Sequence, residues 1–146
     1  MDISHVVSIR RHLKYAWVPF FSRFGKLTPV QIETIPKILD GINVVVTSPT
    51  ASGKTEAVVA PVAELFISRQ WKELAILYIV PTRALANDTF VRIEGPLRDM
   101  GIITALKHGD NPYLSDNLPN CLITTPESLD SLICRRPKIF ATLRAV

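Results

Sequence analysis

The chain has few of the residues that build disulfide frameworks or metal centres. Its 146 residues include two cysteines, Cys121 and Cys134, and three histidines, His5, His12 and His108. Two cysteines are too few for a disulfide scaffold, and none of these five side chains has the short spacing of a zinc site. We expect both cysteines to be buried as small hydrophobic residues, and we expect no zinc site.

Long hydrophobic runs are also missing. Although 47% of the residues are hydrophobic, no apolar run reaches the roughly 18 residues that a membrane-spanning helix needs. The basic N-terminus is not followed by the apolar stretch and small-residue cleavage site of a secretory signal. We therefore expect a soluble, cytoplasmic protein that does not enter a membrane, with the length of one domain and a sizeable core.

Positive charge is concentrated at the N-terminus. Residues 1–26 hold five basic side chains against one acidic side chain, which accounts for the net charge of +4, so the remaining 120 residues are neutral overall. Apolar residues recur there at helical spacing, at Val6, Ile9, Leu13 and Trp17. The pattern predicts an amphipathic helix that ends near Pro19. Its basic face is either solvated, in contact with nucleic-acid phosphates, or in contact with a membrane surface.

Strand and helix signals alternate through the rest of the chain. Thr28 is a good N-cap and Pro29 suits the first helical position, so a helix is predicted over residues 29–39. The β-branched run Val44-Val45-Val46 predicts a central strand over 43–47 that is covered on both faces. Further strands are predicted over 74–80, 102–107 and 121–124, with the start of another over 143–146, and further helices over 54–71, 83–100 and 126–134. This alternation predicts an α/β fold with a parallel sheet and right-handed crossovers.

A candidate phosphate loop lies between a predicted strand and a predicted helix. Its residues are Ser48-Pro49-Thr50-Ala51-Ser52-Gly53-Lys54-Thr55. Backbone N–H groups of the loop can wrap a phosphate, Lys54 can reach its oxygens, and the Thr55 hydroxyl can bind Mg²⁺. Gly53 allows the backbone to come close. Ser48 replaces the first glycine of the usual Walker A pattern, so the loop alone also fits a chance tripeptide, a P-loop kinase or a transporter ATPase.

Four blocks in order resemble the superfamily-two DEAD/DEAH-box helicases. Leu27-Thr28-Pro29-Val30-Gln31 is similar to the Q motif, and Gln31 precedes Lys54 by 23 residues. The phosphate loop through Ala57 is similar to motif I, Pro81–Asp88 to motif Ia, and Ile123–Ser128 to motif Ib. Ala84 and Glu127 stand where DEAD-box proteins proper usually have Glu and Arg, which favours the Lhr-like (large helicase-related) branch. The resemblance covers almost the whole chain from about Phe20.

This resemblance implies a RecA-like P-loop NTPase fold and an ATP-dependent helicase. Gln31 would pair with the adenine edge, the phosphate loop would bind ATP with Mg²⁺, and motifs Ia and Ib would hold the backbone of single-stranded DNA or RNA. The residues implied for the strand are Pro81, Thr82, Arg83, Gly109, Thr125, Pro126 and Glu127. Hydroxyl, guanidinium and helix-start N–H groups are phosphate ligands. Ordinary helix capping is the alternative for both blocks, and Gly109-Asp110 is equally well a simple tight turn.

An Asp-Glu pair occurs nowhere in the sequence. In the resembled family such carboxylates of motif II hold Mg²⁺ and orient the attacking water. We therefore expect a basic helical segment over residues 1–26 and a partial first RecA-like domain over 27–146. Such a chain would bind ATP and a single strand, would need the rest of the helicase with its second RecA-like domain, and would neither hydrolyse ATP nor unwind alone. The alternative is a non-catalytic module that binds single-stranded nucleic acid or a partner protein.

Overall fold

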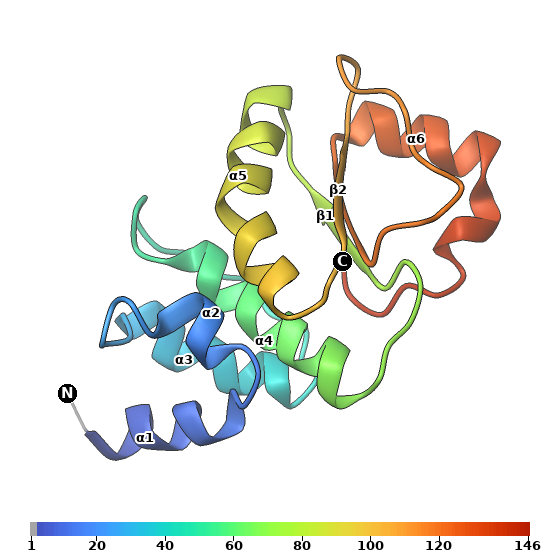
Figure 1. Ribbon diagram of the computed structural model, residues 1–146. Coiled ribbons are helices and arrows are strands. Elements are labelled where there is room, and N and C mark those ends of the chain that lie inside the picture. Colours follow the sequence, from blue (N-terminus) through green and yellow to red (C-terminus); the bar gives the residue numbers. More distant parts are fainter. Residues whose placement is uncertain (1–2) are drawn as a thin grey trace. The chain divides into compact units, whose positions relative to one another are not determined.

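The structure is a computed structural model that describes residues 3–146 (Figure 1). Its internal contacts divide the chain into two compact units, Met1–Gln70 and Trp71–Val146. Each unit has its own packed interior, and the two are described separately below.

The first unit is helical throughout. It contains α1 (Ile3–His12), α2 (Trp17–Phe21), α3 (Pro29–Leu39) and α4 (Lys54–Ser68). Helices α3 and α4 pack along each other, α1 packs against α3, and α2 packs against α4. The side chains that this packing removes from water include Leu13, Phe20, Phe21, Leu27, Ile35, Ala57 and Ala60. Burial of this apolar surface is the main stabilising term for the unit.

The single N-terminal helix predicted to end near Pro19 is wrong, because the chain turns between α1 and α2. Glu64 of α4 causes the break: its carboxylate accepts the backbone N–H groups of Lys14 at 3.1 Å, Tyr15 at 2.8 Å and Ala16 at 2.9 Å. These N–H groups precede α2 and would otherwise lack partners as the first donors of a new helix. An acceptor far away in the sequence therefore decides the local structure.

The predicted helix over 29–39 is confirmed as α3. Thr28 is its N-cap, and Thr28 and Gln31 form a reciprocal capping box in which the side chain of each accepts the backbone N–H of the other. This arrangement satisfies two backbone donors at the helix start. The helix therefore begins where its local sequence signals place it.

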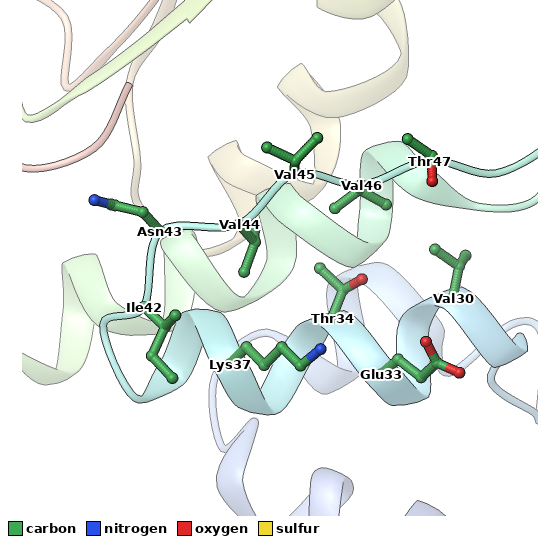
Figure 2. Close-up of a pocket in the computed structure, with 10 residues that line it drawn as sticks. All are labelled: Val30, Glu33, Thr34, Lys37, Ile42, Asn43, Val44, Val45, Val46 and Thr47. Carbon is green, nitrogen blue, oxygen red and sulfur yellow. The ribbon is translucent and has the colours of Figure 1, made fainter.

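The central strand predicted over 43–47 is wrong within the described residues. The segment is extended, but no other segment pairs with its backbone, and Val45 is 94% exposed. Figure 2 shows Val44 and Val46 directed toward α3 and Val45 directed away from it, beside a cleft of about 500 Å³. A strand exists only through its hydrogen bonds to a neighbouring strand. The β-branched sequence gives the extended conformation without the pairing.

The second unit carries a three-stranded parallel sheet in the order β1-β3-β2. Its strands are β1 (Ile76–Ile79), β2 (Thr104–Lys107) and β3 (Cys121–Thr124), each inside or equal to a predicted strand. Ala145 forms a parallel bridge with Ile76, so the C-terminal segment pairs with β1 on the side away from β3. The predicted start of a strand over 143–146 is confirmed to this extent.

Two helices cover the opposite faces of this sheet, α5 (Arg83–Asp99) on one and α6 (Pro126–Arg135) on the other (Figure 1). Successive strand residues point to opposite faces. Leu77 and Leu122 pair in register and pack with Leu132 of α6. A short 3₁₀ helix, η1 (Pro137–Phe140), follows α6 and packs beside it. The sheet is therefore sandwiched between helices, as the alternation of the sequence predicts.

One of the two cysteines is not where we expected it. Cys121, in the central strand, is 1% exposed, but Cys134 is exposed in the last turn of α6. Leu132 turns to the core and Cys134 to water, because two residues on a helix span about 200°. Among residues 3–146, no helix is long and apolar enough to cross a membrane.

Candidate nucleotide and nucleic-acid sites

The candidate phosphate loop leads directly into α4, as the sequence predicts. Gly53 is the N-cap of this helix with a left-handed φ of 87°, and Ala51 also has a left-handed φ of 60°. Left-handed residues turn a backbone tightly and bring successive N–H groups toward one point. The hydroxyls of Ser48 and Ser52 lie 2.5 Å apart and form a hydrogen bond across the loop. Ser48 thus contributes a side-chain contact that the more usual glycine lacks.

The Lys54 ammonium group is folded back onto this loop. It donates to the backbone carbonyl of Ser48 at 2.5 Å and to that of Pro49 at 2.7 Å. A phosphate that entered the loop would replace these neutral acceptors with charged oxygens, which make stronger hydrogen bonds with a cation. Thr55 is the second residue of α4, so its hydroxyl stays at the helix start, beside the loop. The loop, Lys54 and Thr55 therefore fit a nucleotide phosphate with Mg²⁺.

Gln31 of α3 is buried against the end of the phosphate loop. It is 6% exposed, and its Nε2 donates to the backbone carbonyl of Gly53 at 3.3 Å while its Oε1 accepts the Thr28 N–H at 2.9 Å. A Cβ on Gly53 would collide with the Gln31 amide. Gly53 is therefore required both by its left-handed conformation and by the space that Gln31 occupies.

A polar cleft of about 560 Å³ lies in the second unit, where the carboxyl ends of β2 and β3 meet the N-termini of α5 and α6. The carboxyl edge of a parallel sheet is the usual place for ligands in α/β proteins. The cleft brings together six of the seven residues predicted to bind a nucleic-acid strand: Pro81, Thr82, Arg83, Gly109, Thr125 and Glu127. The seventh, Pro126, does not line it.

The Arg83 guanidinium group lies across Gly109. Its Nη1 forms an ion pair with the Asp110 carboxylate at 2.6 Å, with both side chains well exposed. A Cβ built on Gly109 would lie 2.8 Å from the Arg83 Cζ, so no side chain fits there without displacing the arginine. The Gly109-Asp110 turn thus has a definite task in the structure, which is to hold Arg83 at the cleft.

The helix starts beside the cleft are capped differently. The Thr82 hydroxyl accepts the Leu85 N–H at 3.2 Å, so it is already used as a cap of α5. Thr125 is the N-cap of α6 by its backbone, but its side chain makes no capping hydrogen bond. The capping alternative raised by the sequence is thus confirmed for Thr82. The Thr125 side chain does not cap α6.

His108 forms the floor of the turn next to Arg83. It is 3% exposed, its Nδ1 accepts the Asp110 backbone N–H at 3.2 Å, and its Nε2 lies 3.0 Å from the Asn87 Oδ1. With Nδ1 as an acceptor, Nε2 is suited to donate to Asn87. His108 thus fixes the turn through hydrogen bonds of both ring nitrogens.

Sequence reasoning missed six residues that line this cleft: Lys107, His108, Pro112, Ser128, Ser131 and Arg135. Three of them had a signal, because Ser128, Ser131 and Arg135 recur at the three- and four-residue spacing of one helix face. Lys107 and His108 directly precede the Gly109-Asp110 turn, and the carboxyl end of a strand is where such residues gather.

A parallel sheet between helices, with a phosphate loop at the start of a helix, defines the class of phosphate-loop α/β nucleotide-binding proteins. Within this class the sequence is decisive, since a profile of the DEAD/DEAH box helicase family matches residues 28–146. The chain belongs to the DEAD/DEAH box helicase family. The resemblance drawn from Gln31 and the blocks at Lys54, Pro81 and Thr125 is confirmed at this level.

The relatives found include Lhr-type helicases. The ATP-dependent helicase Lhr-Core protein 2 of Thermococcus barophilus is 36% identical over 149 residues, which cover 87% of this chain and 17% of the relative. The ATP-dependent helicase Lhr-Core of Methanothermobacter thermautotrophicus is 35% identical, with 90% of this chain and 18% of the relative covered. The structure of Mycobacterium smegmatis helicase Lhr bound to ssDNA and AMP-PNP matches with a TM-score of 0.74 at 28% identity.

That match covers 89% of this chain and 19% of the Mycobacterium smegmatis protein. The chain therefore spans less than a fifth of the length of each of these relatives, and it corresponds to the N-terminal part of the first motor domain. The predicted RecA-like α/β fold is confirmed.

Proposed function

We propose that this chain is the ATP-binding and strand-binding front part of an ATP-dependent helicase. In this proposal residues 1–26 are a basic helical segment, residues 27–146 form part of the first RecA-like domain, and the second RecA-like domain completes the motor. The ATP site consists of Gln31 and residues 48–55, with Thr55 as a Mg²⁺ ligand. The strand site is the cleft between α5 and α6.

The contact between Gln31 and Gly53 is the observation that carries the ATP site. A buried amide is hydrogen-bonded to the residue at which the phosphate loop becomes α4. The Gln31 amide still has one unused N–H and one unused lone pair, which suit the paired donor and acceptor of an adenine edge. An amide and a phosphate loop held together in this way can hold both ends of one nucleotide.

The strand site is supported by its cationic lining and by its position. The residues that line the cleft include three cationic side chains, Arg83, Lys107 and Arg135, and one carboxylate, that of Glu127. Two helix N-termini, which attract phosphates, open into the same space. Contacts of this kind bind a phosphate backbone without reading bases, so we expect weak sequence preference and a strong dependence on salt for single-stranded DNA or RNA.

A fluorescent ATP analogue with Mg²⁺ tests the ATP site in the purified chain. We expect Lys54→Ala to weaken binding by at least roughly tenfold, since it removes charge-assisted hydrogen bonds to phosphate. Lys37→Ala, which changes an exposed lysine of α3, is the matched control and should bind like the wild type. Equal binding by the Lys54→Ala variant and the wild type would contradict the proposed site.

We further propose that the chain alone does not hydrolyse ATP, because it contains no Asp-Glu pair. Mg²⁺ would be held by Thr55 and phosphate oxygens without the carboxylates that orient the attacking water in this family. Phosphate release from ATP should therefore equal the rate in buffer, with or without a single strand. Release that is abolished by Lys54→Ala would refute this part of the proposal.

A second candidate is a non-catalytic module that binds a single strand. The unpaired segment over 43–47 and the Lys54 ammonium bound to its own loop favour this alternative, since the cleft of the second unit needs neither of them. The two candidates separate in one experiment. Strand binding without any detectable ATP binding would support the module, whereas Lys54-dependent ATP binding would support the helicase front part.

A further inference from the structure

Asn87 of α5 is an exposed residue whose side chain contacts a buried one. It lies one helical turn after Arg83, on the same side of α5, and it is not among the residues that line the cleft of the second unit. Its Oδ1 lies 3.0 Å from Nε2 of His108, which is 3% exposed. The motif-like block Pro81–Asp88 includes Asn87, but the resemblance implies no role for it. The contact with His108 therefore needs its own explanation.

His108 links Asn87 to the Gly109-Asp110 turn. Its Nδ1 accepts the Asp110 backbone N–H at 3.2 Å, and its own backbone exchanges two hydrogen bonds with that of Asn111, at 3.1 and 3.0 Å. An imidazole whose Nδ1 accepts is suited to donate from Nε2, for which the Asn87 Oδ1 is a matching acceptor. The ring is therefore held between α5 and the turn by both of its nitrogens.

The same turn contacts Arg83, so α5 holds it at two places. The Asp110 carboxylate lies 2.6 Å from Nη1 of Arg83, and the guanidinium group lies across Gly109. This ion pair is exposed, with 58% and 69% of the two side chains accessible to solvent, and an exposed pair contributes little by itself. The contact between Asn87 and His108 adds a second attachment that is partly buried. It fixes the turn from which Gly109 and Asp110 direct Arg83.

We propose that Asn87 is a positioning residue for strand binding, which acts on Arg83 through His108 and the Gly109-Asp110 turn. This inference rests on the proposed function, because Arg83 is one of the cationic side chains of the proposed strand site. An arginine side chain has many rotamers, and ordering it on binding costs free energy. A turn that already holds the guanidinium group at the cleft reduces this cost. Asn87 thus strengthens binding without contacting the strand.

Asn87→Ala tests this role, because alanine removes the Oδ1 acceptor and is well tolerated on an exposed helix surface. The melting temperature should change little. The affinity for an oligothymidylate should fall by roughly three- to tenfold, the range for one rotamer-rich side chain that must be ordered on binding. Asn117→Ala is the matched control, since it makes the same chemical change at an exposed position outside the cleft and should bind like the wild type.

A double-mutant cycle with Arg83→Ala separates positioning from direct contact. Binding is measured at low salt, which strengthens it and allows weak variants to be compared. Because Asn87 acts through Arg83, Asn87→Ala should weaken binding in the wild type but not in the Arg83→Ala background. An equal loss in both backgrounds would mean that Asn87 contacts the strand or supports the whole domain, and would overturn the inference. Wild-type affinity in Asn87→Ala would overturn it as well.

Hydrogen exchange of the Asp110 amide distinguishes a failure of this inference from a failure of the proposed function. This amide donates to His108, so it should exchange faster in Asn87→Ala than in the wild type or in Asn117→Ala. Should the wild type bind no oligonucleotide, the proposed strand site is wrong, and faster exchange confined to Asn87→Ala still supports the link from Asn87 to the turn. Unchanged exchange in Asn87→Ala overturns the inference, whether or not a strand binds.

Discussion

Replacing Glu64 with glutamine should release the N-terminal segment from α4. Glu64 is 3% exposed, and one carboxylate oxygen accepts the N–H groups of Tyr15 and Ala16 while the other accepts that of Lys14. The substitution keeps the size of the side chain but replaces one acceptor oxygen with an NH₂ group. The new NH₂ group would lie opposite a backbone N–H, and it cannot accept a hydrogen bond from that group.

The magnitude follows from these three contacts. Hydrogen bonds to a charged acceptor contribute about 1.5–3 kcal/mol each, and neutral ones about 1 kcal/mol. If the amide oxygen keeps Tyr15 and Ala16, those two bonds become neutral, and the Lys14 N–H loses its acceptor. We expect the free energy of unfolding to fall by about 3 kcal/mol. For a domain of this size that corresponds to a drop of roughly 10 °C in melting temperature.

Thermal denaturation and hydrogen exchange measure the two parts of this effect. The Lys14 amide should lose protection in Glu64→Gln because it loses its acceptor, and the amides of Tyr15 and Ala16 should be less protected because their hydrogen bonds become neutral. Glu33→Gln is the matched control, since Glu33 is exposed on α3 and the same chemical change there should cost less than about 0.5 kcal/mol. A Glu64→Gln protein within about 1 kcal/mol of the wild type, with these amides still protected, would refute the argument.

Three further predictions concern the second unit. Gly109→Ala should displace Arg83 and break its ion pair with Asp110. The free energy of unfolding should change by less than about 1 kcal/mol because the pair is exposed, whereas the affinity for a single nucleic-acid strand should fall several-fold. Equal affinity in variant and wild type would show that the placement of Arg83 is unimportant. A thiol reagent should modify only Cys134 in the native protein. Burial raises the pKa of Cys121 to about 12 from its ordinary 9.0, so the unfolded thiol ionises first and stability should fall between these pH values. The fall should reach about 1.4 kcal/mol per pH unit and be absent in Cys121→Ala.

Elements with strong local signals could be predicted from the sequence. Thr28 and Pro29 specify the start of α3, and the run Cys121–Thr124 is a strand with the predicted bounds. Each signal acts within one helical turn or one short strand. Gln31 was also found from the sequence, through the resemblance of its block to the Q motif and its matching distance from the phosphate loop. Its contact with Gly53 gives that spacing a physical meaning.

The predictions that the structure overturned depend on the surroundings of a residue, which local sequence does not encode. The run over 43–47 has the residues of a strand, but pairing depends on a neighbour that local sequence does not encode. Cys134 was expected inside on the strength of its residue type, whereas its position on α6 decides its exposure. Residue type and local pattern thus predict conformation more reliably than they predict surroundings.

The sequence by itself determined the α/β alternation, the order of the motif-like blocks and the family, because these depend on residues close together in the chain. Only the tertiary structure decided that Glu64 divides the N-terminal helix and that Arg83 lies across Gly109. It also decided that Lys107 is buried beside the start of α6. Each of these contacts joins segments brought together by packing, where the position of a partner in space, and not its distance along the chain, determines what a side chain can do.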